Sequence, residues 1–230
     1  MKRALKYRYY DGYGFYLLGV MMRDRGRDEE ALELFRIAAC LDGMNEHRSH
    51  VYFTMARQMN RMDEAMNLLD DRIARFGKKR SSPVMTLVSA QEEMDQTEKC
   101  FVVLEEAMQH HGEDGPFLLF YANFCSRYGR VEKARELLQT AEAHTGRQQW
   151  LHYAAQQASR TGDRETALTC LEELIASDPL NATAHSHALS LIANRDGDAA
   201  AIAGIRAVVE QFPNSYSLRK LLIDLSLIHI

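Results

Sequence analysis

The chain has 230 residues, 46% of them hydrophobic and 26% charged, which is enough apolar material for a continuous core and excludes an intrinsically disordered chain. Its formal net charge of −4 disfavours a dedicated nucleic-acid-binding protein, because such proteins carry a strongly basic surface. No apolar run reaches the ~18 residues of a membrane-spanning helix and none follows the basic first residues, so the sequence predicts neither a membrane partner nor a secretion signal.

Proline and cysteine usage adds two expectations. Only four prolines are present, which favours a mostly helical protein. The four cysteines lie far apart in the sequence without CxxC spacing, and they are Cys40, Cys100, Cys125 and Cys170. This pattern predicts buried, reduced thiols instead of a disulfide framework, and with no secretion signal it predicts a cytoplasmic protein.

The predicted elements recur in a fixed order: a first amphipathic helix, a turn with polar residues, and a second amphipathic helix that carries a small residue near its start. The small residues are Ala31, Ala65, Cys100, Ala134, Ala167 and Ala201. They are separated by 34, 35, 34, 33 and 34 residues. Such similar separations indicate an internal repeat of helical hairpins.

In chain order, the predicted units are 12–45, 46–80, 81–114, 115–147, 148–181 and 182–215, with partial units at 1–11 and 216–230, all in one domain spanning 1–230. Residues 1–10 are expected to end a second helix, and residues 216–230 to form a first helix without a following partner. The apolar end at 225–230 has three interpretations. The chain is a fragment, its last residues are not native sequence, or its last helix is uncapped and offers a surface for self-association.

The turns and ends of the hairpins carry their own signals. Gly26, Gly129 and Gly162 suit the tight turn within a hairpin. A carboxylate is expected at or near the start of the second helix at Asp28, Asp63 and Asp163. Each hairpin is expected to end at one of the breakers Gly43, Gly77, Gly112, Gly146, Pro179 and Pro213. Because one hairpin cannot bury its own apolar faces, neighbouring hairpins must stack.

On these residues the chain resembles the tetratricopeptide repeat family. The matching features are the pair Leu18-Gly19, the five small-residue alanines and the closing prolines Pro179 and Pro213. The resemblance covers essentially all of the chain, although the third unit has Cys100 for alanine and no turn glycine. It implies an all-α, right-handed superhelix of about six hairpins. It also implies a scaffold that binds a protein or peptide, with no enzymatic activity and no cofactor.

The resemblance further implies that the first helix of each hairpin lines a concave groove. The candidate groove residues are Tyr13, Tyr16, Arg23, His47, His50, Arg57, Asn123, Arg127, His152, Gln156 and Arg160. Other polar residues in groove positions are Thr54, Glu92, Glu93, Gln149, Thr183, Ser186, Ser190 and Asn194. We expect Arg57, Arg127 and Arg160 to pair with carboxylates of a partner. The alternative is that these side chains merely form solvated helix faces.

A terminal-carboxylate clamp of the chaperone-adaptor type is not predicted. Its first lysine position holds Tyr16, His50, Met85, Leu119, His152 and Ser186 in successive units. No catalytic or metal site is predicted either, because His47 and His50 share a helix face without a third ligand or an HExxH motif. The segment 77–82 lacks the upstream glycine of a phosphate-binding loop.

Two other functions stay open at this stage. A pentatricopeptide-type array would bind RNA, but the acidic balance and the 34-residue average step argue against it. In the other alternative, the chain is the substrate-recruiting repeat region of a larger multidomain enzyme. The sequence does not distinguish that role from a free-standing scaffold.

Overall fold

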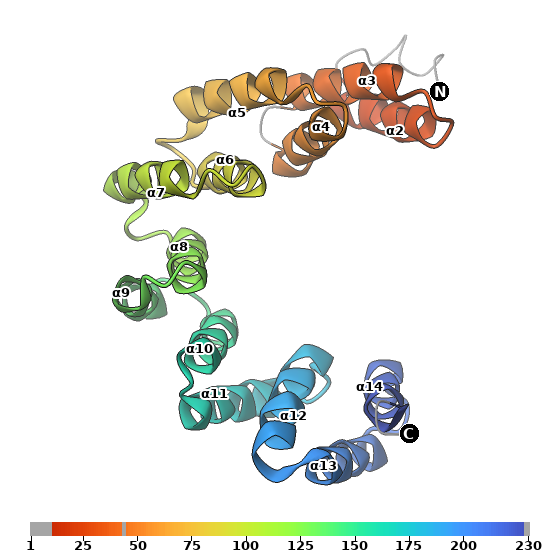
Figure 1. Cartoon of the computed structure of the whole chain (residues 1–230), viewed down its shortest axis with the longest axis vertical. Helices are drawn as coiled ribbons and strands as arrows, with labels where there is room; N and C mark the ends of the chain where they lie inside the picture. Colours follow the sequence, from red (N-terminus) through yellow and green to blue (C-terminus); the bar gives the residue numbers. More distant parts are fainter. Residues whose placement is uncertain (1–10, 43–44, 228–230) are drawn as a thin grey trace. The chain divides into compact units, whose positions relative to one another are not determined.

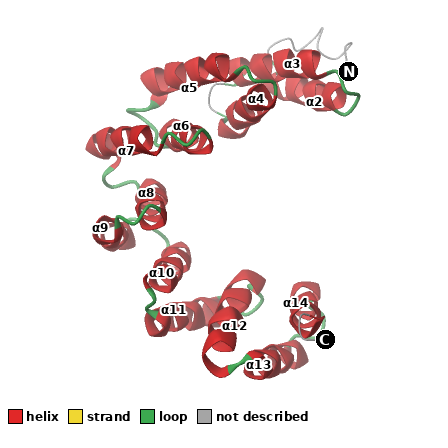
Figure 2. Cartoon of the chain, in the orientation of Figure 1, coloured by secondary structure: helices red, strands yellow, loops and turns green. Residues whose placement is uncertain are grey.

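A computed structural model describes residues 11–42 and 45–227, and all the regular secondary structure in these residues is helical (Figures 1 and 2). The chain divides into two compact units, residues 1–112 and 113–230. The helices of unit 1 are α2 (Gly12–Arg23), α3 (Asp28–Leu41), α4 (Glu46–Gln58), α5 (Met62–Phe76), α6 (Ser82–Glu93) and α7 (Thr97–His111). Those of unit 2 are α8 (Gly115–Arg127), α9 (Val131–Glu142), α10 (Arg147–Thr161), α11 (Arg164–Ser177), α12 (Ala182–Asp196), α13 (Asp198–Gln211) and α14 (Tyr216–Leu227).

The helices pair as hairpins that follow the predicted units, except that α10 begins at Arg147, one residue before the predicted unit 148–181. In unit 1, α2 packs on α3, α4 on α5 and α6 on α7; in unit 2, α8 packs on α9, α10 on α11 and α12 on α13. Consecutive hairpins also touch through their first helices, because α4 contacts α6, α8 contacts α10 and α12 contacts α14. Within each unit the first helices therefore lie in sequence along one side, as the tetratricopeptide resemblance implies.

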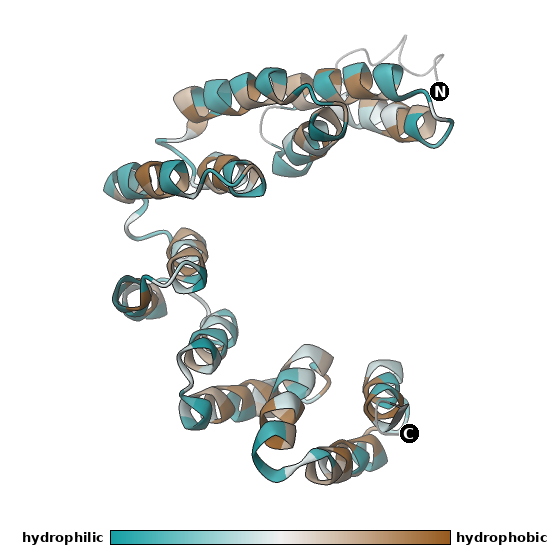
Figure 3. Cartoon of the chain, viewed as in Figure 1, coloured by the Kyte–Doolittle hydropathy of each residue, from teal (hydrophilic) through white to brown (hydrophobic). Residues whose placement is uncertain are grey.

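The small residues of the second helices form the closest contacts between helices. Ala31, Ala65, Cys100, Ala134, Ala167 and Ala201 are each at most 1% exposed. Gly19 serves the same purpose in α2, because a Cβ atom there would lie 2.7 Å from the ring of Phe35. Full burial of a side chain such as Phe35 stabilises the fold by about 1.5–3 kcal/mol. Bands of hydrophobic and hydrophilic residues alternate along the helices, as amphipathic packing requires (Figure 3).

The turn inside the hairpins is the same in five of them, although the residue at its centre differs. The predicted glycines Gly26, Gly129 and Gly162 have φ of 70°, 77° and 82°. Asn60 and Asp95 occupy the equivalent position with φ of 58° and 57°. In each case the next amide donates to a carbonyl five residues earlier, which closes the first helix. Asparagine and aspartate tolerate this left-handed geometry better than other non-glycine residues, which explains the hairpins without a turn glycine.

The helix starts also agree with the sequence. Asp28 and Asp63 lie in the first turns of α3 and α5, and Asp163 caps α11 by accepting a hydrogen bond from the Thr166 amide at 3.1 Å. Hydrogen bonding from the Thr166 side chain, together with this amide hydrogen bond, lowers the pKa of the Asp163 carboxyl group. The expectations for residues 1–10 and for Gly43 lie outside the described residues.

The cysteine prediction was right for three residues and wrong for one. Cys100, Cys125 and Cys170 are buried free thiols, whereas Cys40 is exposed. Cys40 lies at the end of α3 and lines an open pocket between α3 and α5, so the helix periodicity turns it away from the core. None of the described helices combines the length and apolarity that crossing a bilayer requires.

Candidate functional site

In unit 1, the predicted residues of α2 and α4 form one surface. The rings of Tyr13 and Tyr16 stack with centroids 6.3 Å apart. Tyr16 Oη lies 3.3 Å from His47 Nε2, across 31 residues of sequence. The first helices of the first two hairpins therefore present aromatic and imidazole groups side by side.

A pocket of about 340 Å³ follows between α4 and α6, and it contains a carboxylate. His47 and His50 line it together with Glu46 and Thr86. Glu46 is held on both oxygens, since Oε1 accepts a hydrogen bond from Arg72 Nη2 at 2.6 Å and Oε2 accepts one from Thr86 Oγ1 at 2.7 Å. Arg72 is only 5% exposed, whereas the Glu46 side chain is 27% exposed, so the guanidinium group of this ion pair is the part removed from water.

The two predicted arginines of unit 1 both have carboxylate partners within the chain. Arg57 Nη1 donates to Glu93 Oε2 at 2.5 Å, linking α4 to the end of α6. Arg23 Nη2 lies 3.4 Å from Asp24 Oδ1. A partner's carboxylate would have to compete with Glu93 for Arg57.

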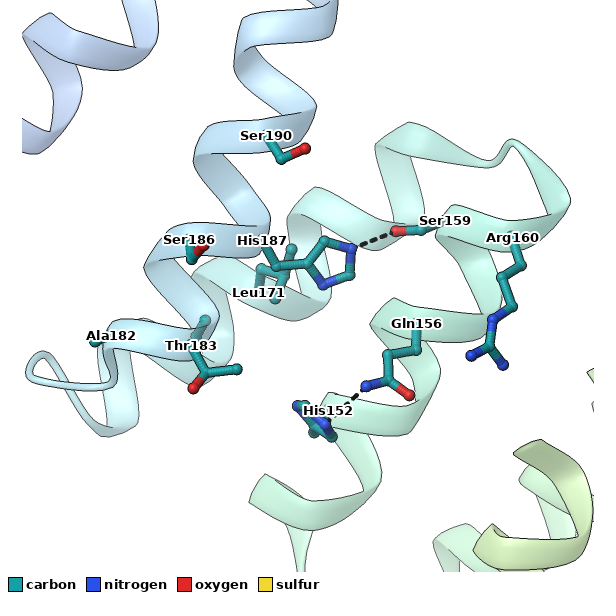
Figure 4. Close-up of a pocket in the computed structure, with 11 residues that line it drawn as sticks. His152, Gln156, Ser159, Arg160, Leu171, Ala182, Thr183, Ser186, His187 and Ser190 are labelled. Atoms are coloured by element: carbon teal, nitrogen blue, oxygen red, sulfur yellow. Dashed lines mark hydrogen bonds between the residues drawn. The ribbon is translucent and has the colours of Figure 1, made fainter. Parts of the chain in front are cut away.

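In unit 2, a pocket of about 640 Å³ lies between α10 and α12 (Figure 4). Its polar residues from α10 are His152, Gln156, Ser159 and Arg160, and those from α12 are Thr183, Ser186, His187 and Ser190. Leu171 of α11 contributes an apolar side chain. This pocket is therefore lined by three predicted groove residues of the fifth hairpin, which are His152, Gln156 and Arg160, and by residues of the sixth hairpin.

Two hydrogen bonds hold the imidazoles of this pocket in place (Figure 4). Gln156 Nε2 lies 2.9 Å from His152 Nε2, one turn apart on α10. His187 Nε2 lies 2.8 Å from Ser159 Oγ, which joins α12 to α10. Burial lowers the pKa of His187, and the nearby His152 lowers it further when charged. His187 therefore stays neutral at neutral pH.

Arg160 connects this pocket to the preceding hairpin. Its Nη1 donates to Asn123 Oδ1 of α8 at 2.7 Å. A smaller pocket between α8 and α10 shares Gln156 and Arg160 with the larger one. Burial lowers the pKa of Arg160, and the positive charge of Arg127 acts in the same direction. The guanidinium group of Arg127 lies 5.5 Å from the centre of the Phe124 ring, against its own helix.

The sequence analysis did not include Ser159 and His187 among the candidates. A signal for His187 was present, because Thr183, His187 and Ser190 follow the i, i+4, i+7 spacing of one helix face. The same spacing was present for Ser159, because His152, Gln156 and Ser159 also lie at i, i+4 and i+7 on α10. In residues 11–42 and 45–227, no cluster of three or more His, Cys, Asp or Glu side chains is arranged to hold a metal ion.

Comparison with known proteins supports the fold. No family model matches the chain. It is 26% identical over 137 residues to the TPR repeat-containing protein YpiA of Bacillus subtilis, a match that covers 60% of this chain and 32% of YpiA. The chain therefore spans about a third of the length of this curated relative.

Two solved structures show the same helical arrangement. A tetratricopeptide repeat protein from Parabacteroides merdae has a TM-score of 0.61 at 16% identity, covering 95% of this chain and 86% of that protein. The APC/C hetero-tetramer Cut9-Hcn1 contains a chain with a TM-score of 0.55 at 12% identity, covering 97% of this chain and 44% of that one. The repeat period, the helical hairpins and these likenesses identify the chain, in its fold, as an array of tetratricopeptide-type repeats.

Proposed function

We propose that the chain is a protein–protein interaction scaffold whose first-helix surfaces bind a protein or peptide partner. The observation that carries this proposal is the open pocket between α10 and α12, lined by polar side chains from the first helices of two consecutive hairpins. Side chains that gather from successive repeats on one side suit an extended partner, which contacts several hairpins at once.

The character of these surfaces also fits protein recognition. Tyr13 and Tyr16 provide aromatic contact area, and Gln156 and Arg160 provide directed hydrogen bonds, which are the groups enriched at protein interfaces. The similar Cut9-Hcn1 structure is a complex of two different proteins, which agrees with this role for the fold. The net charge of −4 supports a protein partner over a nucleic acid.

Three features expected from the sequence remain predictions: a non-enzymatic role, a cytoplasmic location and self-association through the last helix. In α14, Tyr216 and Ile223 are 73% and 57% exposed, so this helix does present apolar side chains to solvent. The partner-binding roles of the individual residues are likewise proposals.

The test compares two matched substitutions in affinity purification with the full chain as bait. Ser186→Tyr fills the pocket between α10 and α12, whereas Thr169→Tyr adds the same bulk to an exposed position on α11. We expect Ser186→Tyr to reduce recovery of a specific partner by about tenfold or more, as for a hot-spot contact, and Thr169→Tyr to leave it unchanged. Equal recovery with both variants would show that this surface is not the binding site.

A further inference from the structure

Two pockets along the first helices α8, α10 and α12 of unit 2 are lined without any carboxylate. Neither the pocket between α10 and α12 nor the smaller pocket between α8 and α10 is lined by an aspartate or glutamate. The chain as a whole has 32 acidic and 28 basic residues, and the corresponding pocket of unit 1, between α4 and α6, is lined by Glu46. We call the residues Asn123, Gln156, Arg160, Thr183, Ser186 and His187 the acid-free surface.

Arg160 is the permanent positive charge of this surface, and its hydrogen-bond partner is neutral. It donates to the amide oxygen of Asn123. Among the described residues no carboxylate forms an ion pair with Arg160, in contrast to Arg57, which Glu93 neutralises. The positive charge of Arg127 lies close enough to disfavour a second cation. An incoming anion would gain a charge-assisted hydrogen bond from Arg160.

The rest of the surface offers hydrogen-bond donors to the same kind of ligand. The hydroxyl groups of Thr183 and Ser186 can each donate to a carboxylate oxygen, and so can the imidazole groups when protonated. The donors are spread over α10 and α12 instead of converging on one point (Figure 4). A pocket of about 640 Å³ with this spread suits several side chains of a peptide better than a single small ion.

We propose that the acid-free surface binds a glutamate- or aspartate-rich segment of a protein partner. One side-chain carboxylate pairs with Arg160, and a second accepts hydrogen bonds from the donors of α12. This inference rests on the proposed scaffold function and adds the chemistry of the partner. It gives unit 2 a selectivity that the carboxylate-containing pockets of unit 1 do not share.

The test measures fluorescence anisotropy of labelled peptides with the full chain. A Glu-rich peptide with blocked termini is compared with a Gln-rich peptide of equal length and with a phosphoserine peptide. We expect the Glu-rich peptide to bind at least ten times more tightly than the Gln-rich one. Arg160→Gln should weaken its binding by about tenfold, the loss of one charge-assisted hydrogen bond, whereas Arg160→Lys should retain part of the affinity.

The matched control is Arg135→Gln, which removes the same charge from an exposed ion pair with Glu132 on α9. Its affinity for the Glu-rich peptide should stay within a factor of two of the unsubstituted chain. Circular dichroism establishes that each variant is folded.

Three results would overturn the inference: equal binding of the Glu-rich and Gln-rich peptides, an Arg160→Gln variant that binds as well as the parent, or a preference for the phosphoserine peptide. If the inference fails while Ser186→Tyr still abolishes partner recovery, the scaffold function stands without the acidic partner. Equal recovery with Ser186→Tyr and Thr169→Tyr would instead remove the scaffold proposal itself.

Discussion

Units 1 and 2 are built from the same hairpins, but their first-helix surfaces differ in charge. In unit 1, Arg57 is neutralised by Glu93, and Glu46 lines the pocket that holds His50. In unit 2, Arg160 donates to the neutral Asn123, and no carboxylate lines the adjoining pockets. The repeat specifies the packing positions in both units and leaves the outward positions free to vary. Binding selectivity can therefore change from one part of the array to the next without any change of fold.

The largest expected difference between the units concerns ion pairs. Glu46→Ala in unit 1 should lower the free energy of unfolding by about 3–5 kcal/mol, because it leaves the buried Arg72 charge without its carboxylate. The Nε and Nη1 atoms of Arg72 are buried without a hydrogen-bond partner, so no other described group takes over. Urea denaturation followed by circular dichroism measures the change.

A matched control for this prediction lies in unit 2. Glu173→Ala removes a carboxylate from Arg147, but both side chains are about half exposed, so water replaces the lost partner and the urea midpoint should barely move. The double substitution Glu46→Ala/Arg72→Met should recover most of the lost stability, since it removes the buried charge as well. A stability loss with Glu173→Ala as large as with Glu46→Ala would contradict this account.

A second difference concerns two glycines at equivalent positions, each following an aspartate N-cap at the start of a first helix. A Cβ atom at Gly115 would overlap the backbone carbonyl oxygen of His144, whereas at Gly12 its nearest contact is the end of the flexible Arg48 side chain. Gly115→Ala should therefore lower the free energy of unfolding by about 1–3 kcal/mol, as overpacking does, and Gly12→Ala should lower it by less. Thermal unfolding of the two variants measures both losses of stability, and a larger loss for Gly12→Ala than for Gly115→Ala would contradict this prediction.

A third substitution should make unit 1 behave more like unit 2. Glu93→Gln removes the carboxylate from Arg57 and leaves a neutral amide in its place. We expect the affinity of unit 1 for the Glu-rich peptide to rise by about two- to threefold, in line with the modest value of a partly exposed charge pair. Isothermal titration calorimetry should detect binding of the peptide to unit 1 as a second site that is weaker than the site in unit 2. Absence of that site in the variant would mean that Arg57 does not face a bound peptide.

The smallest expected effect is a pH dependence in unit 2. The ionisable side chains of the pocket are His152 and Arg160 on α10 and His187 on α12, while α11 contributes only Leu171. The pKa of His187 is lowered from its ordinary value of 6.5, so the folded state binds this proton less readily than the unfolded state. Its contribution to stability is therefore present above pH 6.5 and is lost as the pH falls through the lowered pKa.

The His187→Gln variant isolates this contribution. Its urea midpoint should fall less steeply below pH 6.5 than that of the unsubstituted chain, because the variant has no imidazole to protonate. Identical slopes in the two proteins would show that His187 titrates normally. The same protonation adds positive charge to the acid-free surface, so affinity for the Glu-rich peptide should increase at acidic pH.

The period and the core were predictable from the sequence because they depend on spacing within each helix. Ala31 and its equivalents are buried as predicted, since the close approach of two helices leaves room only for a small side chain. Contacts between hairpins were not predictable. The Arg57–Glu93 and Ser159–His187 pairs join residues 36 and 28 positions apart, and their distances depend on the packing angle of successive hairpins. The exposure of Cys40, in contrast, follows from the periodicity of α3, which buries Ala38 and Ala39 and turns Cys40 outward.

The central claim is that the first helices of unit 2 carry the binding surface. The most direct test is a titration of the isotope-labelled full chain with the Glu-rich peptide, followed through backbone amide chemical shifts. The account predicts that the largest shifts occur at Gln156, Arg160 and His187, with little change along α9 and α11. Shifts concentrated on those second helices would contradict it.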